Sequence, residues 1–418
     1  MDVIVVGAGP AGAATALLLA RAGYEVALLD RQAFPRAKPC GDCLSAGAAR
    51  VLDRLGLLQA IEAERPARLE GWRITAPGGH AFEARFAPFA DGDPRAATAI
   101  ALARHRLDHV LLEGARRAGA DFRPGIHVTD LLRDSGGRIV GVTGRGPDGA
   151  PATLRARLVI GADGLRSIVA RRLGLIRRPP RLRKLSFTAH LRGVRGVGHL
   201  GEMHLAPGAC AGLAPVEDAP GDTVCCNLTL VVDAARFGAE ARRDPTGFYW
   251  RTLARFPGLA HRLDDARPAG TDPRPLLASG PFDWPTRTAA TQGAALVGDA
   301  AGYYDPFTGQ GIHLALASAE VLAEEADAAL RTGDLRLRRY ARRHARLVRG
   351  ARALQRLIEL VVSRPRLADA AIRRLARDPS AAHALIATTA GLRPPRSLLS
   401  LPLLLSFLFG SPLRDRPE

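Results

Sequence analysis

Lysine is nearly absent from this sequence: only Lys38 and Lys184 occur, although lysine and arginine together number 59 and the formal net charge is +18. Almost all of the basic charge is therefore arginine, and with the abundant alanine this indicates a GC-rich coding bias. No nucleic-acid-binding module or aromatic platform accompanies the charge, so nucleic acid is not an expected partner. Attraction to an anionic membrane or substrate is compatible with it.

Regularly spaced cysteines and long apolar runs are also missing. The five cysteines show no spacing typical of a secreted disulfide framework, and Met1 leads directly into a strand-like run without room for a signal peptide. We therefore expect a cytoplasmic protein. The apolar stretch SLLSLPLLLSFLFG at residues 397–410 is too short to span a membrane and contains Pro402. It either packs on the protein itself or contacts the inner face of a membrane beside basic helices.

The first thirty residues carry the clearest motif. Residues 2–6 form an apolar, β-branched run typical of a buried strand, residues 13–22 predict a helix that ends at Gly23, and residues 24–29 predict a second strand. Between the first strand and the helix lies GAGPAG at residues 7–12, which matches G-x-G-x-x-G. This register favours a dinucleotide site over an α/β unit with incidental glycines.

Each position of this motif has a physical role in such a site. Gly7 permits the tight turn, Gly9 lets the backbone approach a pyrophosphate, and Gly12 lets helix and strand pack closely. The helix that follows Pro10 and Ala11 offers free N–H groups and a positive dipole end to phosphates.

An acidic residue completes the unit. Asp30 ends the second strand, eighteen residues after Gly12, and is placed to accept hydrogen bonds from an adenosine ribose. Arg31 follows it in the same loop and is assigned to the same site. The opening stretch therefore predicts an ADP-containing dinucleotide.

Two further strand-and-glycine turns lie far along the chain. Residues 158–160 lead into GADG at residues 161–164, and residues 294–297 lead into GDAAG at residues 298–302. The second turn continues to Ile312, where a strong helix begins. The three segments resemble the three FAD motifs of the para-hydroxybenzoate hydroxylase fold, and the resemblance covers about the first 340 residues.

Within this superfamily the resemblance is to the geranylgeranyl reductases. It rests on KPCGDCLS at residues 38–45 and on GDAAG followed by P-x-T-G-x-G-I at residues 298–312. Gly302 stands where monooxygenases of the fold more often have histidine. Gln310 favours the monooxygenases instead, because G-Q-G is common in monooxygenases and an acidic residue is usual at this position in the reductases.

The resemblance implies an α/β fold with a discontinuous, Rossmann-like FAD-binding domain of the GR2 type, a mixed β-sheet substrate domain and a helical C-terminal region. It implies FAD as cofactor and NAD(P)H as the electron donor. The predicted segments are 1–70, 98–170 and 286–340 for FAD binding, 71–97 and 171–285 for the substrate domain, and 341–418 for the C-terminal helices.

The resemblance also assigns roles to single residues. Asp163 would contact the dinucleotide near the pyrophosphate, and Asp299 would accept hydrogen bonds from the ribityl hydroxyls where Gly298 lets the chain pass closely. Backbone N–H groups at a helix start would face the flavin N1–C2=O edge and stabilise reduced flavin. These N–H groups belong to Gly309, Gln310, Gly311 and Ile312.

Several basic residues have two interpretations. Arg104, on a helix predicted at residues 104–118, resembles the arginine that reaches FAD phosphate or ribityl oxygens in this fold. The alternative for Arg104 is a solvated helix face. Arg36 and Lys38, in the loop that leads into the flavin region, carry the same ambiguity.

Cys40 and Cys43 form C-x-x-C. No second such pair and no nearby histidine pair accompany them, so a zinc site is not expected. The resemblance places Cys40 and Gly41 in a loop near the isoalloxazine, and a flavin-coupled dithiol is the alternative. Cys40 and His313 are the candidate catalytic residues, although His313 also fits a packed helix histidine.

The sequence of the predicted substrate domain contains fewer motifs that identify a function. Reductases of this family show an aromatic Y-x-W-x-F-P segment, whereas the counterpart here, CAGLAP at residues 210–215, keeps the proline and has no aromatic residue. The W-x-W-x-I-P segment and the catalytic lysine of flavin halogenases are not evident, which disfavours halogenation.

Two enzymatic functions follow. In the first, reduced FAD delivers hydride to a C=C bond of a lipophilic small molecule, as in the geranylgeranyl reductases. In the second, the protein is a monooxygenase, and reduced FAD captures O₂ as a C4a-hydroperoxide that hydroxylates or epoxidises an aromatic or polyketide-type substrate. The cofactor carries the hard chemistry in both. A non-enzymatic FAD-binding interaction protein is a third, distant alternative. We expect a monomer or homodimer.

Overall fold

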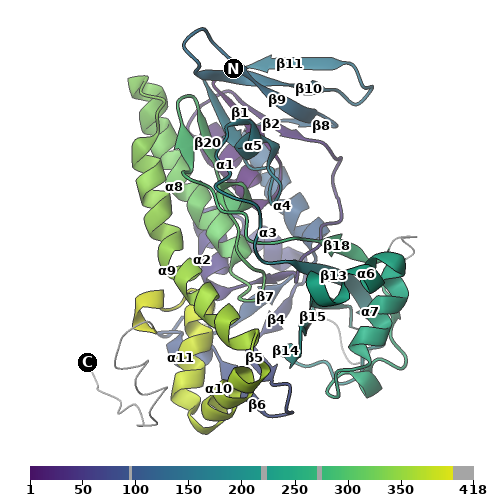
Figure 1. Cartoon of the computed structure of the whole chain (residues 1–418). Helices are drawn as coiled ribbons and strands as arrows, with labels where there is room; N and C mark the ends of the chain where they lie inside the picture. Colours follow the sequence, from purple (N-terminus) through teal and green to yellow (C-terminus); the bar gives the residue numbers. More distant parts are fainter. Residues whose placement is uncertain (94–96, 218–223, 271–274, 399–418) are drawn as a thin grey trace.

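A computed structural model describes residues 1–93, 97–217, 224–270 and 275–398 (Figure 1). Residues 399–410 of the apolar C-terminal stretch lie outside the described residues. Within the described part, a six-stranded sheet lies at the end of the molecule where Figure 1 marks the N-terminus, and an eight-stranded sheet lies toward the opposite end. Two three-stranded sheets and the helices complete the fold.

The six-stranded sheet is built around the first strand of the chain. Its order is β19-β20-β12-β1-β2-β8, and all neighbours are parallel except β19 and β20. The central strand has no exposed surface at Val3, Ile4 and Val5, as expected for a β-branched strand covered on both faces. The strands are β1 (Val3–Val6), β2 (Val26–Asp30), β8 (Asp121–Pro124), β12 (Leu158–Gly161), β19 (Ala290–Thr291) and β20 (Ala294–Leu296).

Helices cover this sheet, and α1 contacts both α4 and α8. Helix α1 begins at Pro10, inside the glycine motif, and not at residue 13 as the sequence predicts. Proline suits the first helical position because its missing N–H would be unpaired there in any case. The helices of this region are α1 (Pro10–Arg21), α2 (Ala46–Arg54), α3 (Leu58–Ala63), α4 (Arg104–Arg117), α5 (Ile168–Arg172) and α8 (Gly311–Thr332).

Two small sheets flank the main one. The first has the order β11-β10-β9, and the second has the order β3-β7-β4. The second sheet carries the C-x-x-C segment, because β3 begins at the second cysteine of that motif. Their strands are β9 (His127–Arg133), β10 (Ile139–Arg145), β11 (Pro151–Arg155), β3 (Cys43–Leu44), β4 (Ala67–Leu69) and β7 (Ala99–Ala101).

The eight-stranded sheet joins two distant parts of the chain. Its order is β17-β13-β16-β15-β14-β5-β6, with β18 on β13, and only β14 and β5 are parallel. The strands are β5 (Gly71–Thr75), β6 (Ala81–Arg85), β13 (Lys184–Arg192), β14 (Leu200–Ala206), β15 (Ala209–Pro215), β16 (Cys226–Asp233), β17 (Arg267–Pro268) and β18 (Leu277–Ser279). Helices α6 (Ala234–Arg243) and α7 (Pro245–Leu253) pack on it through a separate apolar cluster.

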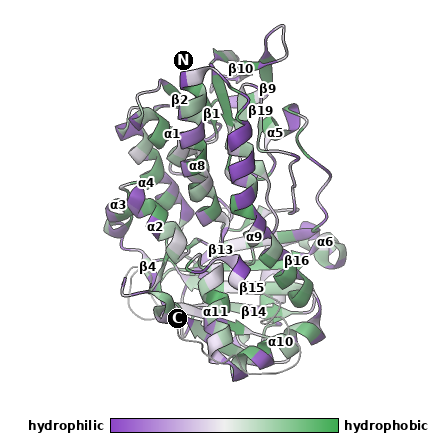
Figure 2. Ribbon diagram, turned by 90° about the vertical axis from the view of Figure 1, so that its left-hand side faces the viewer, coloured by the Kyte–Doolittle hydropathy of each residue, from purple (hydrophilic) through white to green (hydrophobic). Residues whose placement is uncertain are grey.

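The last described part of the chain, residues 338–398, is a helical region that contacts both large sheets. Helix α9 (Arg338–Val362) packs along α8, whereas α10 (Pro365–Arg377) and α11 (Pro379–Thr389) pack on β6. Figure 2 shows the arginine-rich α9 as hydrophilic and the central strands as hydrophobic. The predicted fold class, with a Rossmann-like domain, a mixed sheet and C-terminal helices, is confirmed.

The glycine turns of the chain interlock. Gly7 has a φ of 103°, a left-handed conformation that glycine adopts without steric cost. A side chain at Gly7 would meet the backbone of Ala162, and a side chain at Gly12 would overlap the carbonyl oxygen of Gly7. The first and second motifs can therefore approach each other only with glycine at these positions.

Replacing Gly12 by alanine tests this packing. Alanine gains roughly 1 kcal/mol in helix propensity, but its methyl group must displace the Gly7 backbone. We expect the overlap to dominate, with a net loss of about 2–3 kcal/mol in the free energy of unfolding and weaker FAD retention, measured by denaturant titration and by flavin fluorescence.

The matched control is Gly198→Ala. Gly198 is exposed, and nothing lies within 4 Å of a side chain placed there. The control should unfold within about 0.5 kcal/mol of the wild type. If Gly12→Ala behaves like the control, the glycine turns are not tightly interlocked.

Candidate flavin and substrate site

A large cavity of about 1320 Å³ lies between the six-stranded sheet, the eight-stranded sheet and the C-terminal helices. Pockets for a single drug-sized ligand occupy roughly 300–1,000 Å³, so this cavity has room for a cofactor and a second molecule. Most of the predicted cofactor residues line it, namely Gly7, Gly9, Pro10, Ala11, Asp30, Arg31, Cys40, Gly41, Arg104, Asp163, Asp299, Gly309, Gly311 and Ile312.

Three predicted cofactor residues do not line the cavity. Gly12 packs α1 on the Gly7 turn, and Gly298 has a φ of 60° and leaves no room for a side chain beside Ala11. Gln310 is buried, and its side-chain amide donates to Thr388 O at 3.4 Å. These residues shape the backbone around the cavity and do not present side chains to it.

Asp30 and Asp163, the carboxylates predicted to contact the adenosine ribose and the pyrophosphate, each accept hydrogen bonds that fix the turn around them. Asp30 Oδ2 accepts a hydrogen bond from Ala8 N at 3.0 Å, which fixes the first glycine loop. Asp163 accepts from Ser167 Oγ at 2.5 Å and from Ile168 N at 2.6 Å. Asp163 thus orders the start of α5, a role that the sequence did not reveal, and burial raises its pKa. The proposed ribose and pyrophosphate contacts of Asp30 and Asp163 stay predictions.

Three cations crowd together beside these turns. Arg104 is 9% exposed and binds Asp108 through two hydrogen bonds of 2.7 and 2.9 Å, so it does not lie on a solvated helix face. Arg36 approaches the same carboxylate, with Nη1 at 3.2 Å from Asp108 Oδ2. Burial, followed by repulsion from Arg104 and Arg36, lowers the pKa of Lys38 on the cavity wall.

This cluster fits the diphosphate of a dinucleotide. Arg36 Nη1 is buried and makes no hydrogen bond with the described residues, and Arg36 lies next to Gly9, where the backbone has no side chain. Crowded cations of this kind are stabilised by a bound anion. The glycine turns, the helix start at Pro10 and the three clustered cations therefore match the diphosphate of FAD.

Asp42 links several elements around the cavity, a role that no sequence pattern indicates. It is 1% exposed and has a positive φ of 59°. Its Oδ1 accepts from Arg104 N at 3.1 Å, and its Oδ2 accepts from His190 Nε2 and from Asn227 Nδ2, both at 2.6 Å. Asn227 Nδ2 also donates to Cys40 O at 2.7 Å. One carboxylate thus ties the cysteine loop and α4 to strands β13 and β16.

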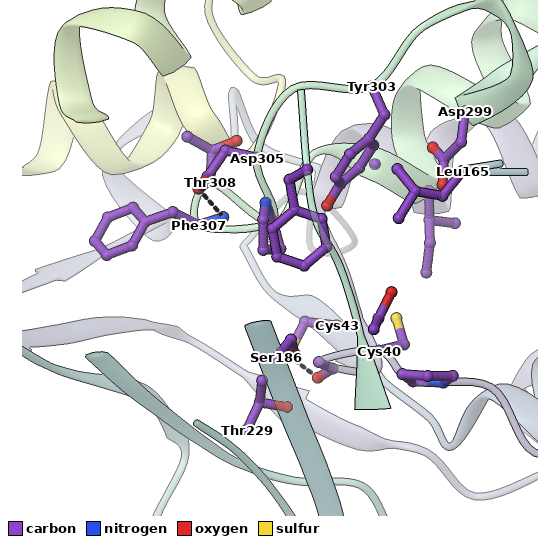
Figure 3. Close-up of a pocket in the computed structure, with 18 of the residues that line it drawn as sticks. Cys40, Cys43, Leu165, Ser186, Thr229, Asp299, Tyr303, Asp305, Phe307 and Thr308 are labelled. Carbon is purple, nitrogen blue, oxygen red and sulfur yellow. Dashed lines mark hydrogen bonds between the residues drawn. The ribbon is translucent and has the colours of Figure 1, made fainter. Parts of the chain in front are cut away.

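Both cysteines of C-x-x-C are free thiols that line the cavity. Burial raises the pKa of Cys40 and of Cys43, so both thiols stay protonated at neutral pH. Figure 3 shows the two cysteines on one loop beneath Tyr303. Thiols with raised pKa values are poor nucleophiles, and this environment does not favour a flavin-coupled dithiol.

His313 lies outside the cavity lining. It is packed against Gly47 and Gly391, and its Nδ1 is buried without a hydrogen-bond partner among the described residues. Burial lowers its pKa, so the ring is neutral. The position is that of a packed helix histidine. Cys225 and Cys226 are likewise buried.

The end of the cavity away from the glycine turns is an apolar chamber between the eight-stranded sheet and α9, α10 and α11. Strand β15 contains the CAGLAP segment and contributes the small residues Cys210, Gly212 and Ala214 to the wall. The larger side chains come from other elements. They include Trp72, Ile74, Phe82, Met203, Leu205, Phe307, Leu357, Ile358, Val361, Ile372, Leu375, Leu385 and Ile386.

Lys184 stands in the wall of this chamber at the start of β13. Its Nζ lies 3.0 Å from Asp305 Oδ2 and also contacts Glu359 of α9. Burial alone would lower the pKa of Lys184, but the two carboxylates outweigh it and raise the pKa. Asp305 is itself held by a hydrogen bond from Phe307 N at 2.9 Å (Figure 3).

None of the helices formed by the described residues is both long and apolar enough to cross a membrane. The described residues also contain no group of three or more histidine, cysteine, aspartate or glutamate side chains arranged to hold a metal ion.

Comparison with known proteins agrees with the fold and the cavity. Residues 1–190 match the family described as "FAD binding domain". Digeranylgeranylglycerophospholipid reductase 1 of Methanopyrus kandleri is 30% identical over 342 residues, which are 80% of this chain and 82% of that protein. A menaquinone reductase of Mycolicibacterium smegmatis is 38% identical over 173 residues, which are 41% of this chain but only 40% of the reductase. The fold is shared with the crystal structure of a flavoprotein/dehydrogenase from Cytophaga hutchinsonii, with a TM-score of 0.80 and 22% sequence identity. The similarity covers 94% of this chain and 93% of that chain.

Halogenases and monooxygenases are also among the similar proteins and structures. All of these reductases, monooxygenases and halogenases are enzymes, and the protein is an FAD-binding oxidoreductase. It belongs to the FAD-dependent oxidoreductase family with the para-hydroxybenzoate hydroxylase fold that includes the geranylgeranyl reductases.

Replacing Asp42 by asparagine tests its role as the link between the two sheets. Asparagine also tolerates a positive φ, but it removes the negative charge of the carboxylate that accepts hydrogen bonds from Arg104 N, His190 Nε2 and Asn227 Nδ2. We expect a loss of about 2–3 kcal/mol in the free energy of unfolding and weaker FAD binding. The control is Asp91→Asn, because Asp91 also has a positive φ of 50° but is exposed. Equal stabilities of the two variants would contradict the proposed link.

The contact between His190 and Asp42 predicts a pH dependence of stability. Burial alone would lower the pKa of His190, but Asp42 outweighs it and raises the pKa in the folded protein. The contribution of the pair is therefore complete below the unfolded histidine pKa of about 6.5 and is lost as pH rises through the folded pKa.

We expect the stability difference between the wild type and His190→Gln to shrink as pH rises from about 5.5 to 8.5, measured by urea unfolding at fixed FAD concentration. The neighbouring His105 does not reverse this trend, because burial and His190 lower its pKa. The exposed His199 provides the control, His199→Gln. A pH-independent difference for His190→Gln would show that the pair does not titrate in this range.

Proposed function

We propose that this FAD-dependent oxidoreductase reduces a C=C bond of a lipophilic molecule. The observation that carries the proposal is the apolar chamber, which continues directly from the predicted flavin site into the space beneath α9, α10 and α11. Bound FAD would supply the hydride. The chamber side chains would hold an apolar chain beside it and exclude water, which prevents side reactions of a reactive centre.

The chain's own residues supply a suitable environment. Arg36, Lys38 and Arg104 would hold the cofactor phosphates, and Asp299 its ribityl hydroxyls. Reduction of C=C also needs a proton, and the Cys40 thiol is a protonated group on the cavity wall. We propose NAD(P)H as the electron donor, since enzymes of this fold usually accept it without a separate domain.

Oxygenation is the second candidate function. The sequence feature that favours it is Gln310 in G-Q-G, together with the monooxygenases among the structural neighbours. Halogenation has less support, because the lysine in the chamber, Lys184, is engaged by two carboxylates.

Anaerobic turnover separates the two functions. The purified holoprotein is reduced with NADH or NADPH under nitrogen and mixed with a prenyl quinone, and products are analysed by mass spectrometry. Because reduction of the quinone ring to the hydroquinone also adds two hydrogens, the product is re-oxidised in air to its quinone form before analysis. We then expect a product heavier by two hydrogens, formed at an undiminished rate without oxygen during turnover. Product that forms only in air, heavier by one oxygen atom, would establish the monooxygenase function instead.

A further inference from the structure

Positive charge is distributed unevenly along the cavity. The part near the glycine turns is lined by many cations, including Arg31, Arg36, Lys38, Arg104, Arg166 and Arg171. In the apolar chamber, by contrast, Lys184 and Arg374 are the only cations among the described residues of the wall. An anionic group therefore has strong partners at one end of the cavity and few at the other.

Both chamber cations already have carboxylate partners. Lys184 contacts Asp305 and Glu359, and the exposed fractions of the three side chains are 20%, 4% and 12%. Two carboxylates around one ammonium group leave no net positive charge. Arg374 lies 4.0 Å from Asp378, four residues on in the sequence and also on the chamber wall.

A buried phosphate needs cations that are free to contact it, because an ion taken out of water is stabilised only by well-placed partners. To bind a phosphate here, Lys184 would have to leave Asp305 and Glu359, and both carboxylates would then face the phosphate. The negatively charged carboxylates and phosphate would repel each other strongly, because the dielectric constant of a buried chamber is low. The chamber therefore disfavours a phosphate or diphosphate head group.

Neutral hydrogen-bonding groups are present instead. Ser186 of β13 and Thr229 of β16 stand on paired strands and both line the cavity (Figure 3). Thr229 Oγ1 is oriented by hydrogen bonds of 2.8 Å to Thr188 Oγ1 and to Asn227 Oδ1. Because the Thr229 hydroxyl hydrogen is donated to Asn227 Oδ1, Thr229 can only accept from an alcohol, whereas the Ser186 hydroxyl can donate to a carbonyl oxygen or accept from an alcohol.

We infer that the substrate is an apolar chain bearing a neutral oxygen function, a carbonyl or hydroxyl as in a quinone or a prenyl alcohol, and not a prenyl phosphate or diphosphate. The inference rests on the proposed function, because it names the substrate class of the same site. It does not depend on whether the substrate is reduced or oxygenated.

Binding of a matched pair of ligands tests it. FAD-loaded protein is titrated with farnesol and with farnesyl diphosphate, which share one chain, and the flavin absorbance change gives each Kd. We expect farnesol to bind at least tenfold more tightly. A diphosphate that binds as well as or better than the alcohol overturns the inference, and so does the absence of binding by both ligands.

A variant tests the cause. Glu359→Gln leaves Lys184 with one charged partner, so the diphosphate should bind several-fold more tightly while farnesol binding is unchanged. The control is Glu324→Gln, since Glu324 pairs with Arg343 on the exposed surface outside the cavity, and neither Kd should change. If Glu359→Gln leaves the diphosphate Kd unchanged, the charge balance at Lys184 does not select the head group.

The two proposals fail separately. If farnesol binds preferentially but no anaerobic reduction of a prenyl quinone is found, the proposed reaction is wrong and the substrate class stands. If the quinone is reduced anaerobically but farnesyl diphosphate is the preferred ligand, the reaction stands and the substrate class is wrong.

Discussion

One buried carboxylate links the two halves of this protein. Asp42 accepts hydrogen bonds from α4, from β13 and from β16, and these elements belong to different layers of the fold. Removing water from a carboxylate is costly unless donors replace it, so the loop and both layers must be in place together. The position of the cysteine loop, and with it the boundary between the flavin site and the chamber, depends on this one group.

The cofactor half was predictable from sequence because its chemistry is local. A strand, three glycines and a helix follow one another in about twenty residues, and each glycine has a steric reason that a single sequence reveals. The same holds for the turns around Asp163 and Asp299. What the sequence could not provide is the pairing of Asp42 with His190 and Asn227, since these partners lie about 150 residues or more away and none belongs to a local pattern.

The substrate half was less predictable for a related reason. The CAGLAP segment forms the expected strand β15, but its small side chains do not show that Trp72, Phe82 and Phe307 approach from other elements. A chamber wall assembled from several strands and three helices has no linear signature. The pairing of Lys184 with Glu359 is of the same kind, because it depends on where α9 crosses the sheet.

The scarcity of lysine acquires a meaning once the structure is known. The two lysines of the chain stand in the wall of one cavity, Lys38 among the cations near the glycine turns and Lys184 in the apolar chamber. Apart from the α-amine of Met1, the primary amines of this sequence therefore lie only in the wall of the cavity that we propose as the ligand site. Because burial, Arg104 and Arg36 lower the pKa of Lys38, an amine-selective acylating reagent should modify that residue and report whether the predicted cofactor site is occupied, whereas two carboxylates hold Lys184 protonated and protect it.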